Sequence, residues 1–467
     1  MNPSLQDLVL SFSDPDFKAK LKKLRSEMLE AARLAGPESE QNRTVVGILR
    51  DVAERGDPAV AEYTKKFDGA TLEPSQFRVT PDELSRAHQS LDRRLLASLR
   101  QAIANVRAYQ EKIFIGRRSE FSQGTGIKYV PIRRAGVCVP GAAAPLPSTV
   151  IMTVVPAQVA GVKEIAVVSP PRYRAGPEDA KRNLQSEIRN PKSEIGTIHP
   201  VILAICHELK VSEVYRLGGV QAVGALAFGT QTIAPVDKIV GPGNKWVQSA
   251  KKNVAGDYVG IDSIAGPSEV LVIANDQANP AWVAADMLSQ AEHGTDSSAI
   301  VVTDSEPLAR ALLKQLGRQL ESLPRAAEAA QSLQRFSRII VVGSMEEAVE
   351  LANEFAAEHL EVQCGTESRR LAEGITNAGA IFIGPCTPVA VGDYWAGPSH
   401  TLPTGSRARF SSALTSNDFV KSISLIEYTA AQLAAAADDI IRLAETEGLD
   451  AHARSVQLRV GRASLLA

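Results

Sequence analysis

Hydrophobic residues recur with a helical period in the N-terminal third of the chain and in short β-rich runs after it. Residues 80–110, TPDELSRAHQSLDRRLLASLRQAIANVRAYQ, repeat apolar side chains at helical spacing, and Thr80, Pro81 and Glu83 supply an N-cap, a first helical position and a capping box. From about Gly136, helical stretches alternate with the β-rich runs EIAVVS, EVYRLGG, DKIVG, EVLVIA, AIVVT, RIIVVG and GAIFIG. The pattern predicts one long helix over 80–110 in a helical N-terminal third, followed by an α/β fold with doubly wound parallel sheet.

Turn signals and changes in composition and secondary-structure pattern indicate where the domains meet. A Gly-Pro turn near Gly266 separates two β-rich runs, and after about Ser411 the chain is again mostly helical. Residues 172–198 are charged and poor in large apolar side chains, which predicts a surface insertion. The expected parts are a helical arm (1–35), a first Rossmann-like unit (36–135 with 267–410), a second Rossmann-like unit (136–266) and a helical tail (411–467).

Composition favours a small-molecule ligand. In 467 residues, 51 Lys and Arg balance 53 Asp and Glu, which argues against nucleic acid or an anionic membrane as the main partner. The first thirty residues lack the apolar stretch of a signal peptide, and Pro, Gly or charge interrupts every long apolar run, so we expect a soluble, cytoplasmic protein. The cysteines lack CxxC spacing and are expected to be buried thiols: Cys138, Cys206, Cys364 and Cys386.

The segment SQAEH, which ends at His293, raises the question of a metal site. Gln290 and His293 are three residues apart and would share one helix face, whereas Glu292 points away, so two ligands can converge. Polar residues at a helix C-terminus more often meet solvent and favour the helix dipole. Glutamine is also an uncommon zinc ligand, so the pair by itself favours the solvated helix end.

Glu358 and His359, in FAAEHLE, are candidates for acid-base chemistry. We expect them at the end of a helix that begins near Met345. An adjacent carboxylate and imidazole could accept a proton from a hydroxyl group and from water near neutral pH. The alternative is a solvated helix terminus, which is the more frequent outcome for such a pair.

Further polar residues follow in loops near the C-terminus. A Gly- and Pro-rich loop after the run GAIFIG carries Asp393 and His400, and α/β proteins keep their sites in loops at the carboxyl ends of parallel strands. Near the end, Glu447 and His452 are five apart and would not share a helix face unless Gly448 breaks the helix.

Signals for a nucleotide are weaker. GPGNKW, from Gly241, lacks the third glycine of the GxGxxG fingerprint. RLGGVQAVGALAFG, from Arg216, has a Gly-Gly turn before a helix whose N-terminal amides could receive a pyrophosphate. A tight structural turn explains either segment equally well.

Taken together, these segments resemble the histidinol dehydrogenase family. The resemblance covers nearly the whole chain from about residue 40, and it is carried by VPGAAAPLPST, LGGVQAVGALAFGT, VDKIVGPGNKWV, IDSIAGPSEVLVIA, DMLSQAEHG, AAEHLE, VGDYWAGPSHTLPT and LDAHARSVQLR. Several long motifs in the same order are more specific than any one pair of residues. The resemblance implies an NAD-dependent, zinc-containing enzyme that oxidises L-histidinol through L-histidinal to L-histidine, the last steps of histidine biosynthesis.

The resemblance also implies roles for individual residues. It implies one zinc ion per subunit, held by Gln290, His293, Asp393 and His452, which also line the substrate site. It assigns Glu358 and His359 to acid-base catalysis, with His359 also touching substrate. Further substrate contacts are Ser268, His400 and Glu447, and the NAD contacts are Cys138, Gln221 and Asn244. It implies a homodimer whose active sites are shared, with His452 reaching the zinc of the other subunit.

One departure from the family pattern motivates one alternative. Where the family commonly has Tyr-Val-Pro-Gly-Gly, this chain has Cys138 and ends the segment with Ala142. This change motivates the hypothesis of a zinc- and nucleotide-binding protein without catalytic activity. Two further hypotheses are a dehydrogenase of a related amino alcohol and an aldehyde dehydrogenase acting through a covalent thiohemiacetal on Cys138.

Overall fold

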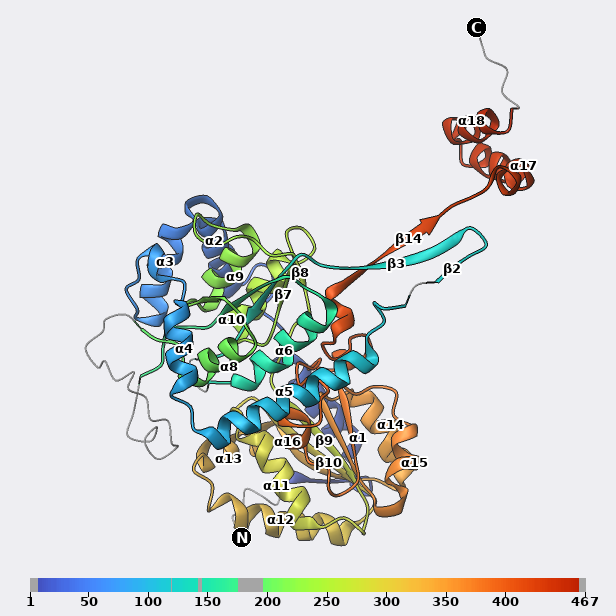
Figure 1. Ribbon diagram of the computed structural model, residues 1–467. Helices are drawn as coiled ribbons and strands as arrows, with labels where there is room; N and C mark the ends of the chain where they lie inside the picture. The colour runs from blue at the N-terminus through green and yellow to red at the C-terminus, as the bar shows by residue number, and fades with distance from the viewer. Residues whose placement is uncertain (1–6, 119, 142–144, 175–195, 462–467) are drawn as a thin grey trace. The chain divides into compact units, whose positions relative to one another are not determined.

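The chain forms two compact units. The computed structural model describes residues 7–118, 120–141, 145–174 and 196–461. The first unit comprises Met1–Phe114 and Ile132–Phe419, and the second comprises Ile115–Pro131 and Val420–Ala467. Each unit is described separately below, with the element labels of Figure 1.

A six-stranded parallel sheet forms one half of the first unit. Its strands lie in the order β1 (Val9–Ser11), β11 (Arg338–Val341), β10 (Ser298–Thr303), β9 (Glu269–Ala274), β12 (His359–Gln363) and β13 (Ala380–Ile383). Apart from β1 at the edge, this is the doubly wound order, in which the chain starts in the middle, moves to one edge and then reverses.

Helices cover both faces of the six-stranded sheet, because its strands are apolar on both sides (Figure 1). One face packs against α11 (Pro280–Ala291), α12 (Glu306–Leu320), α13 (Ala326–Phe336) and the start of α16 (Val389–Tyr394). The other face packs against α1 (Phe17–Ala32), α14 (Met345–Phe355) and α15 (Ser368–Glu373).

A five-stranded parallel sheet forms the other half of the first unit and repeats the doubly wound order. Its strands are β6 (Glu213–Tyr215), β5 (Glu164–Val168), β4 (Arg134–Cys138), β7 (Lys238–Val240) and β8 (Gly260–Ile261). The helices inserted between them are α6 (Pro147–Ala160), α8 (Pro200–Glu208), α9 (Gly219–Phe228) and α10 (Lys245–Val254). Two doubly wound parallel sheets confirm the predicted fold class, and every β-rich run expected from the sequence forms a strand.

The N-terminal helices differ from expectation in two ways. The single helix expected over 80–110 is wrong: α4 (Pro81–Gln89) ends before Asp92, whose side chain caps α5 (Arg93–Ile113). The capping box of Thr80 and Glu83 is confirmed. The other helices here are α2 (Glu40–Arg55) and α3 (Asp57–Asp68).

The region 36–135 was expected to belong with the six-stranded sheet. Instead, α2 and α3 share one apolar core with the five-stranded sheet and its helices, while α4 packs on α8 and α5 on α6. Hydrophobic periodicity identifies the buried face of a helix but does not identify the sheet that the helix covers.

The second unit contains a sheet that was not expected. Strands β2 (Glu120–Ser122), β3 (Thr125–Pro131) and β14 (Val420–Ile426) pair antiparallel, and two helices follow, α17 (Ala430–Thr446) and α18 (Asp450–Arg459). The expected tail at 411–467 is therefore helical only after β14. Its sheet was missed because it joins two segments that are far apart in the chain.

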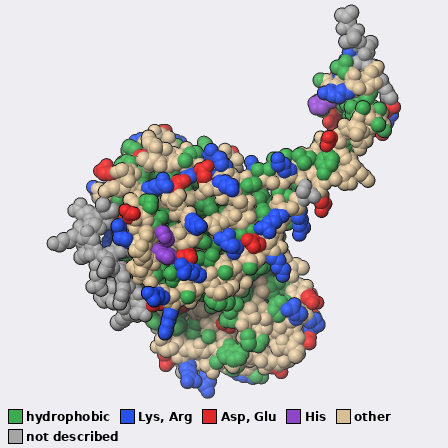
Figure 2. Space-filling view, viewed as in Figure 1, with side chains coloured by type: hydrophobic (Ala, Val, Ile, Leu, Met, Phe, Trp, Pro, Cys, Tyr) green, Lys and Arg blue, Asp and Glu red, His purple; other side chains and the backbone are tan. Residues whose placement is uncertain are grey.

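The predicted surface insertion at 172–198 lies mostly outside the described residues, since 175–195 are not described. Its two described ends pair through an antiparallel bridge between Tyr173 and Thr197. Over the face shown in Figure 2, acidic and basic side chains are interspersed, as the near-equal charge counts predict. No helix in the described ranges is long and apolar enough to cross a membrane.

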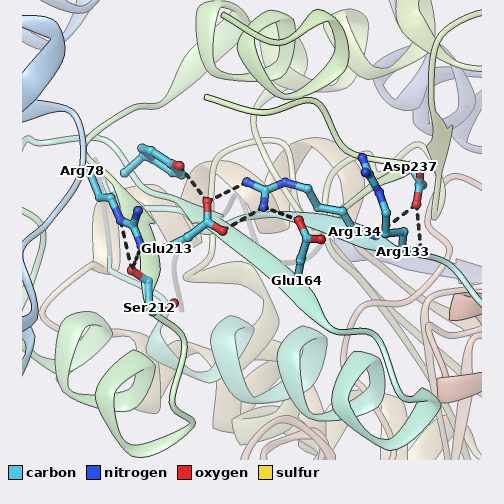
Figure 3. Close-up of polar contacts among 8 residues, drawn as sticks. Arg78, Arg133, Arg134, Glu164, Ser212, Glu213 and Asp237 are labelled. Carbon is cyan, nitrogen blue, oxygen red and sulfur yellow. Dashed lines mark hydrogen bonds and ion pairs between the residues drawn. The ribbon is translucent and has the colours of Figure 1, made fainter. Parts of the chain in front are cut away.

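A buried guanidinium joins three strands of the five-stranded sheet at their amino ends (Figure 3). Arg134 is 2% exposed and donates to both carboxylate oxygens of Glu213, at 2.8 and 2.7 Å, and to Glu164 at 3.1 Å. The Tyr215 hydroxyl also donates to Glu213, at 2.8 Å. The hydrogen bonds from Arg134 lower the pKa of Glu213, so this carboxylate stays ionised and paired at neutral pH.

Replacing Arg134 should destabilise the fold strongly. Arg134→Met leaves the Glu213 carboxylate without its partner, and we expect the free energy of unfolding in urea to fall by about 3 kcal/mol. Arg133→Met, at the adjacent exposed position, is the matched control and should change stability little. Equal effects of the two substitutions would contradict a structural role for the buried pair.

Candidate active site

Glu358 and His359 lie at the beginning of a strand. Helix α14 ends at Phe355, Ala356 adopts a left-handed conformation with φ of 49°, and His359 is the first residue of β12. The expected position at a helix end is therefore wrong. The helix ends at a left-handed alanine rather than at glycine, so the sequence lacks the usual stop signal.

The backbone of Glu269, the first residue of the neighbouring strand β9, holds both side chains. Its N–H donates to Glu358 Oε2 at 3.0 Å, and its carbonyl oxygen lies 3.0 Å from His359 Nδ1. Because a carbonyl oxygen can only accept, His359 Nδ1 carries the hydrogen of this bond. Nε2 is buried without a hydrogen-bond partner among the described residues, so it is the nitrogen available for proton transfer.

Asp393 and His400 face the same imidazole. Asp393 is in the short helix α16, and its Oδ1 lies 3.8 Å from His359 Nε2 and 4.0 Å from His400 Nδ1. The ring of Phe382, in β13, lies beside that of His359, with 5.9 Å between the centroids. The structure therefore brings together four of the residues predicted from the sequence, Glu358, His359, Asp393 and His400, at the amino end of the six-stranded sheet.

Burial and mutual charge set the protonation of the acid-base pair. Burial raises the pKa of Glu358 to about 7. Burial alone would lower the pKa of His359, but the carboxylates of Glu358 and Asp393 raise it to about 9. Burial likewise opposes ionisation of Asp393, yet its contacts with His359 lower the pKa of Asp393 overall. At neutral pH, before any cation binds, His359 is therefore an imidazolium ion facing an ionised Asp393.

Glu269 was not anticipated as part of the site. Its side chain is 7% exposed and accepts a hydrogen bond from the Gly405 N–H at 3.0 Å. Burial, followed by repulsion from Glu358, raises the pKa of Glu269 to about 8. Its only signal in the sequence is a single acid at the start of an apolar strand, where a solvated strand end would be the ordinary interpretation.

The metal ligands expected in the first unit fit a cation. Gln290 lies in the last turn of α11 and is 1% exposed. Its side-chain Nε2 has no hydrogen-bond partner in the described ranges. Its main-chain carbonyl oxygen accepts from the His293 N–H at 3.2 Å. The helix ends at Ala291, so His293 follows it rather than sharing its face. Because Nε2 can only donate a hydrogen bond, a cation would be bound by the amide oxygen of Gln290, Oε1. With Asp393, these donors suit a borderline cation such as Zn²⁺.

Within the described residues, no group of three or more His, Cys, Asp or Glu is arranged to hold a metal ion. The first unit contributes only one His and one Asp to the expected set, because its third donor is an amide. Ser268, an expected substrate contact, directly precedes Glu269, and its carbonyl accepts from the Ser298 N–H.

The remaining expected ligand and one expected substrate contact belong to the second unit. Helix α17 ends at Thr446, Gly448 has φ of 72°, and α18 begins at Asp450. The break that Gly448 could provide is therefore present. Both Glu447 and His452 are exposed on either side of it.

The carboxyl edge of the five-stranded sheet carries the expected nucleotide contacts. In a doubly wound sheet a nucleotide binds where the strand order reverses, here between the ends of β4 and β7. Gly241, after β7, has φ of 106°, and a Cβ there would lie 2.3 Å from the Cys138 carbonyl oxygen. Glycine is therefore required for the close approach of the two chains.

A buried ion pair holds this loop. Asp262 Oδ2 accepts from the Gly241 N–H at 2.7 Å, and Lys251 Nζ donates to Asp262 Oδ1 at 2.5 Å and to the Gly241 carbonyl at 3.0 Å. The Asn244 side chain caps α10, accepting from the N–H groups of Trp246 and Val247. These contacts were not anticipated, because Lys251 and Asp262 carry no motif.

Gln221 and Cys138, the other expected NAD contacts, are both buried. Gln221 Nε2 donates to Asp68 Oδ2 at 3.4 Å. Ala142 lies outside the described residues. Burial raises the pKa of Cys138 to about 12, so the thiolate needed for a covalent aldehyde dehydrogenase mechanism is disfavoured. The expectation of four buried thiols is wrong for Cys386, which is exposed.

The raised pKa of Glu269 predicts a pH-dependent stability. Between its ordinary value of 4.5 and about 8, the folded protein binds a proton that the unfolded chain does not. The stabilisation is complete at low pH and is lost as the pH rises through about 8. In metal-free protein, we expect Glu269→Gln to make the decline in unfolding free energy from about pH 6 to about pH 8 shallower, by up to about 1.4 kcal/mol per pH unit. Glu350→Gln, an exposed position on α14, should leave the decline unchanged; an equal slope in all three proteins would contradict the assignment.

Comparison with known proteins identifies the family. The family model described as histidinol dehydrogenase matches residues 32–182 and 185–460. The histidinol dehydrogenase of Geobacillus kaustophilus is 43% identical over 447 residues, which cover 94% of this chain and 99% of the relative. That of Bacillus subtilis is 45% identical over 435 residues, 92% of this chain and 95% of the relative. A crystal structure of histidinol dehydrogenase from Elizabethkingia anophelis matches with a TM-score of 0.85 and 35% identity, covering 97% of this chain and 98% of that one. From its sequence and its fold, the chain belongs to the histidinol dehydrogenase family.

Proposed function

We propose that this protein is a zinc-containing, NAD-dependent dehydrogenase that oxidises L-histidinol through L-histidinal to L-histidine in histidine biosynthesis. The observation that carries the proposal is the environment of His359, whose Nδ1 is bound to the Glu269 carbonyl and whose Nε2, 3.8 Å from Asp393 Oδ1, has no hydrogen-bond partner among the described residues. Family membership supports the substrate and the reaction class.

Four residues would hold the metal: Gln290, His293, Asp393 and His452. When bound, zinc would fix the amine and imidazole of the substrate, and NAD would accept hydride in both oxidations. Glu358 and Asp393 both raise the pKa of His359, and a cation bound by Asp393 would offset the second contribution and shift this imidazole toward its neutral, basic form.

The acid-base pair divides the proton transfers. His359 Nε2 accepts the proton of the alcohol as the alcohol is oxidised to the aldehyde. Glu358, with a pKa of about 7, then accepts a proton from the water that adds to the aldehyde carbon. The hydrated aldehyde loses its second hydride and becomes the carboxylate. The Glu269 backbone keeps both bases oriented through the two steps.

Measuring the stoichiometry of the reaction tests this proposal. Wild-type protein loaded with zinc should form two NADH for each L-histidine. Glu358→Gln retains an oxygen that can accept from the Glu269 N–H but cannot take a proton from water, so we expect it to release L-histidinal after one NADH, with the second step slowed roughly 10²- to 10⁴-fold.

Oxidation of added L-histidinal separates the two steps, since Glu358→Gln should be deficient there and nearly normal in the alcohol step. Equal losses in both steps would contradict the division of labour. A folded, zinc-loaded wild-type protein without turnover would instead support the hypothesis of a binding protein without catalytic activity.

We propose further that the protein is a homodimer in which the second unit of one subunit supplies Glu447 and His452 to the other. The second unit has little apolar core of its own, because the buried residues of α17 and α18 are alanines. Large apolar side chains of β14, of these helices and of the segments between them are exposed, namely Ile426, Tyr428, Leu443, Leu449 and Leu458. Such apolar surface favours packing against another protein surface (Figure 2).

Mixing two inactive variants tests this exchange. His359→Ala and His452→Ala chains should each be inactive alone. After refolding together, every hybrid dimer should contain one intact site, so random pairing restores roughly a quarter of all sites. If His452 serves its own subunit, every site keeps one lesion, and hybrids of verified composition and zinc content would remain inactive.

A further inference from the structure

A polar network lies behind the candidate active site, on the otherwise apolar face of the six-stranded sheet that packs against α11. Glu361, in β12, is 1% exposed, and Gln363 is 3% exposed. Gln363 Nε2 donates to Glu361 Oε2 at 2.6 Å and to Asp286 Oδ2, in α11, at 2.8 Å. Glu361 Oε1 accepts from the backbone N–H of Val389, the first residue of α16, at 3.1 Å. Together with Gln363, the Glu361 carboxyl group thus links β12 to the two helices α11 and α16.

Each of the three linked elements also carries a residue of the candidate site, two residues away in the strand and four residues away in each helix. His359 is two residues from Glu361 in β12, so the two side chains share a face of the sheet. Gln290 is four residues from Asp286 in α11, and Asp393 is four residues from Val389 in α16, one helical turn in each case. The network therefore lies one layer deeper than the base and two of the expected metal ligands.

Stability alone does not account for these buried acids. Their neighbours on this face are apolar, among them Val272 and Met287. Apolar side chains of similar volume would usually be as stable as a buried polar cluster. Burial raises the pKa of Glu361 and that of Asp286, as expected where carboxyl groups are withdrawn from water and share a site.

We propose that Glu361 is a positioning residue, which fixes α16 and α11 relative to β12 so that Asp393 and Gln290 can bind the same zinc ion beside His359. The inference rests on the zinc site of the proposed function. Residues behind a metal site orient its ligands, and their loss typically lowers metal affinity or activity 10- to 100-fold.

Substituting Glu361 tests the role directly. Glu361→Met fills a similar volume but cannot accept from Val389, and we expect zinc affinity, measured by competition with a chelator, to fall about 10- to 100-fold. Glu361→Gln keeps an oxygen for the Val389 N–H, and its new N–H group faces Gln363, whose amide can turn so that Oε1, unpartnered among the described residues, accepts from it. This variant should therefore retain near-wild-type affinity. A merely structural role would lower the stability of Glu361→Met without changing the zinc affinity of the folded protein.

A second pair of variants leaves Glu361 in place and removes only its backbone partner. Val389→Pro deletes the N–H at the first helical position, where proline is well tolerated, and Pro388 before it already has the extended conformation that a following proline requires. Val389→Ala keeps the N–H and serves as the control for the lost side chain. We expect Val389→Pro to bind zinc more weakly than Val389→Ala by about tenfold.

These measurements are independent of histidinol turnover. A wild-type protein that binds zinc but does not oxidise L-histidinal or L-histidinol would refute the proposed function and leave this inference standing. Unchanged zinc affinity in Val389→Pro relative to Val389→Ala, or in folded Glu361→Met, would overturn the inference, as would a wild-type protein that binds no zinc. If Glu361→Met fails to fold, the Val389 pair decides.

Discussion

Two hydrogen bonds from one backbone residue set the geometry of the candidate active site. At the amino end of the six-stranded sheet, β9 and β12 are parallel neighbours, and the N–H and C=O of Glu269 are taken by the side chains of Glu358 and His359. Because the strand ladder fixes Glu269, it also fixes that Nδ1 is the imidazole nitrogen held by the backbone and that Nε2 faces Asp393. The orientation of the bases is thus a property of sheet pairing rather than of a flexible loop.

The molecule holds buried charge at the amino ends of both sheets, with opposite consequences. Arg134 is permanently charged, and its Nη1 and Nη2 are paired with the carboxylates of Glu164 and Glu213, so it links strands and has no proton that it readily gives up. At the other sheet the buried cation is His359, which can lose its proton, and its Nε2 has no hydrogen-bond partner among the described residues. One buried charge therefore stabilises a sheet, and the other has a proton that can be transferred.

The candidate site residues of the two sheets in the first unit lie at opposite ends of the strands. The loop after β7 follows the usual rule that ligands bind at the carboxyl ends of parallel strands, and Lys251 and Asp262 hold it in place. The acid-base pair lies at amino ends, where the last turn of α11 arrives and α16 brings Asp393 back toward β12. In the six-stranded sheet these residues therefore lie at the edge opposite to the one where ligands of doubly wound sheets usually bind.

Local patterns in the sequence determined most of the elements. Alternating apolar runs predicted the parallel strands, Thr80 with Glu83 predicted a helix start, and Gly448 indicated where a helix could break, because each depends on neighbours within a few residues. The sequence singled out Glu358 and His359 as an acid-base pair, but the helical pattern before them predicted a helix end. Only the tertiary structure decided that they lie at the start of a strand, and that the Glu269 backbone holds both side chains. It also decided which sheet the N-terminal helices cover. These features depend on contacts between distant segments, and hydrophobic periodicity records that a face is buried without recording what buries it.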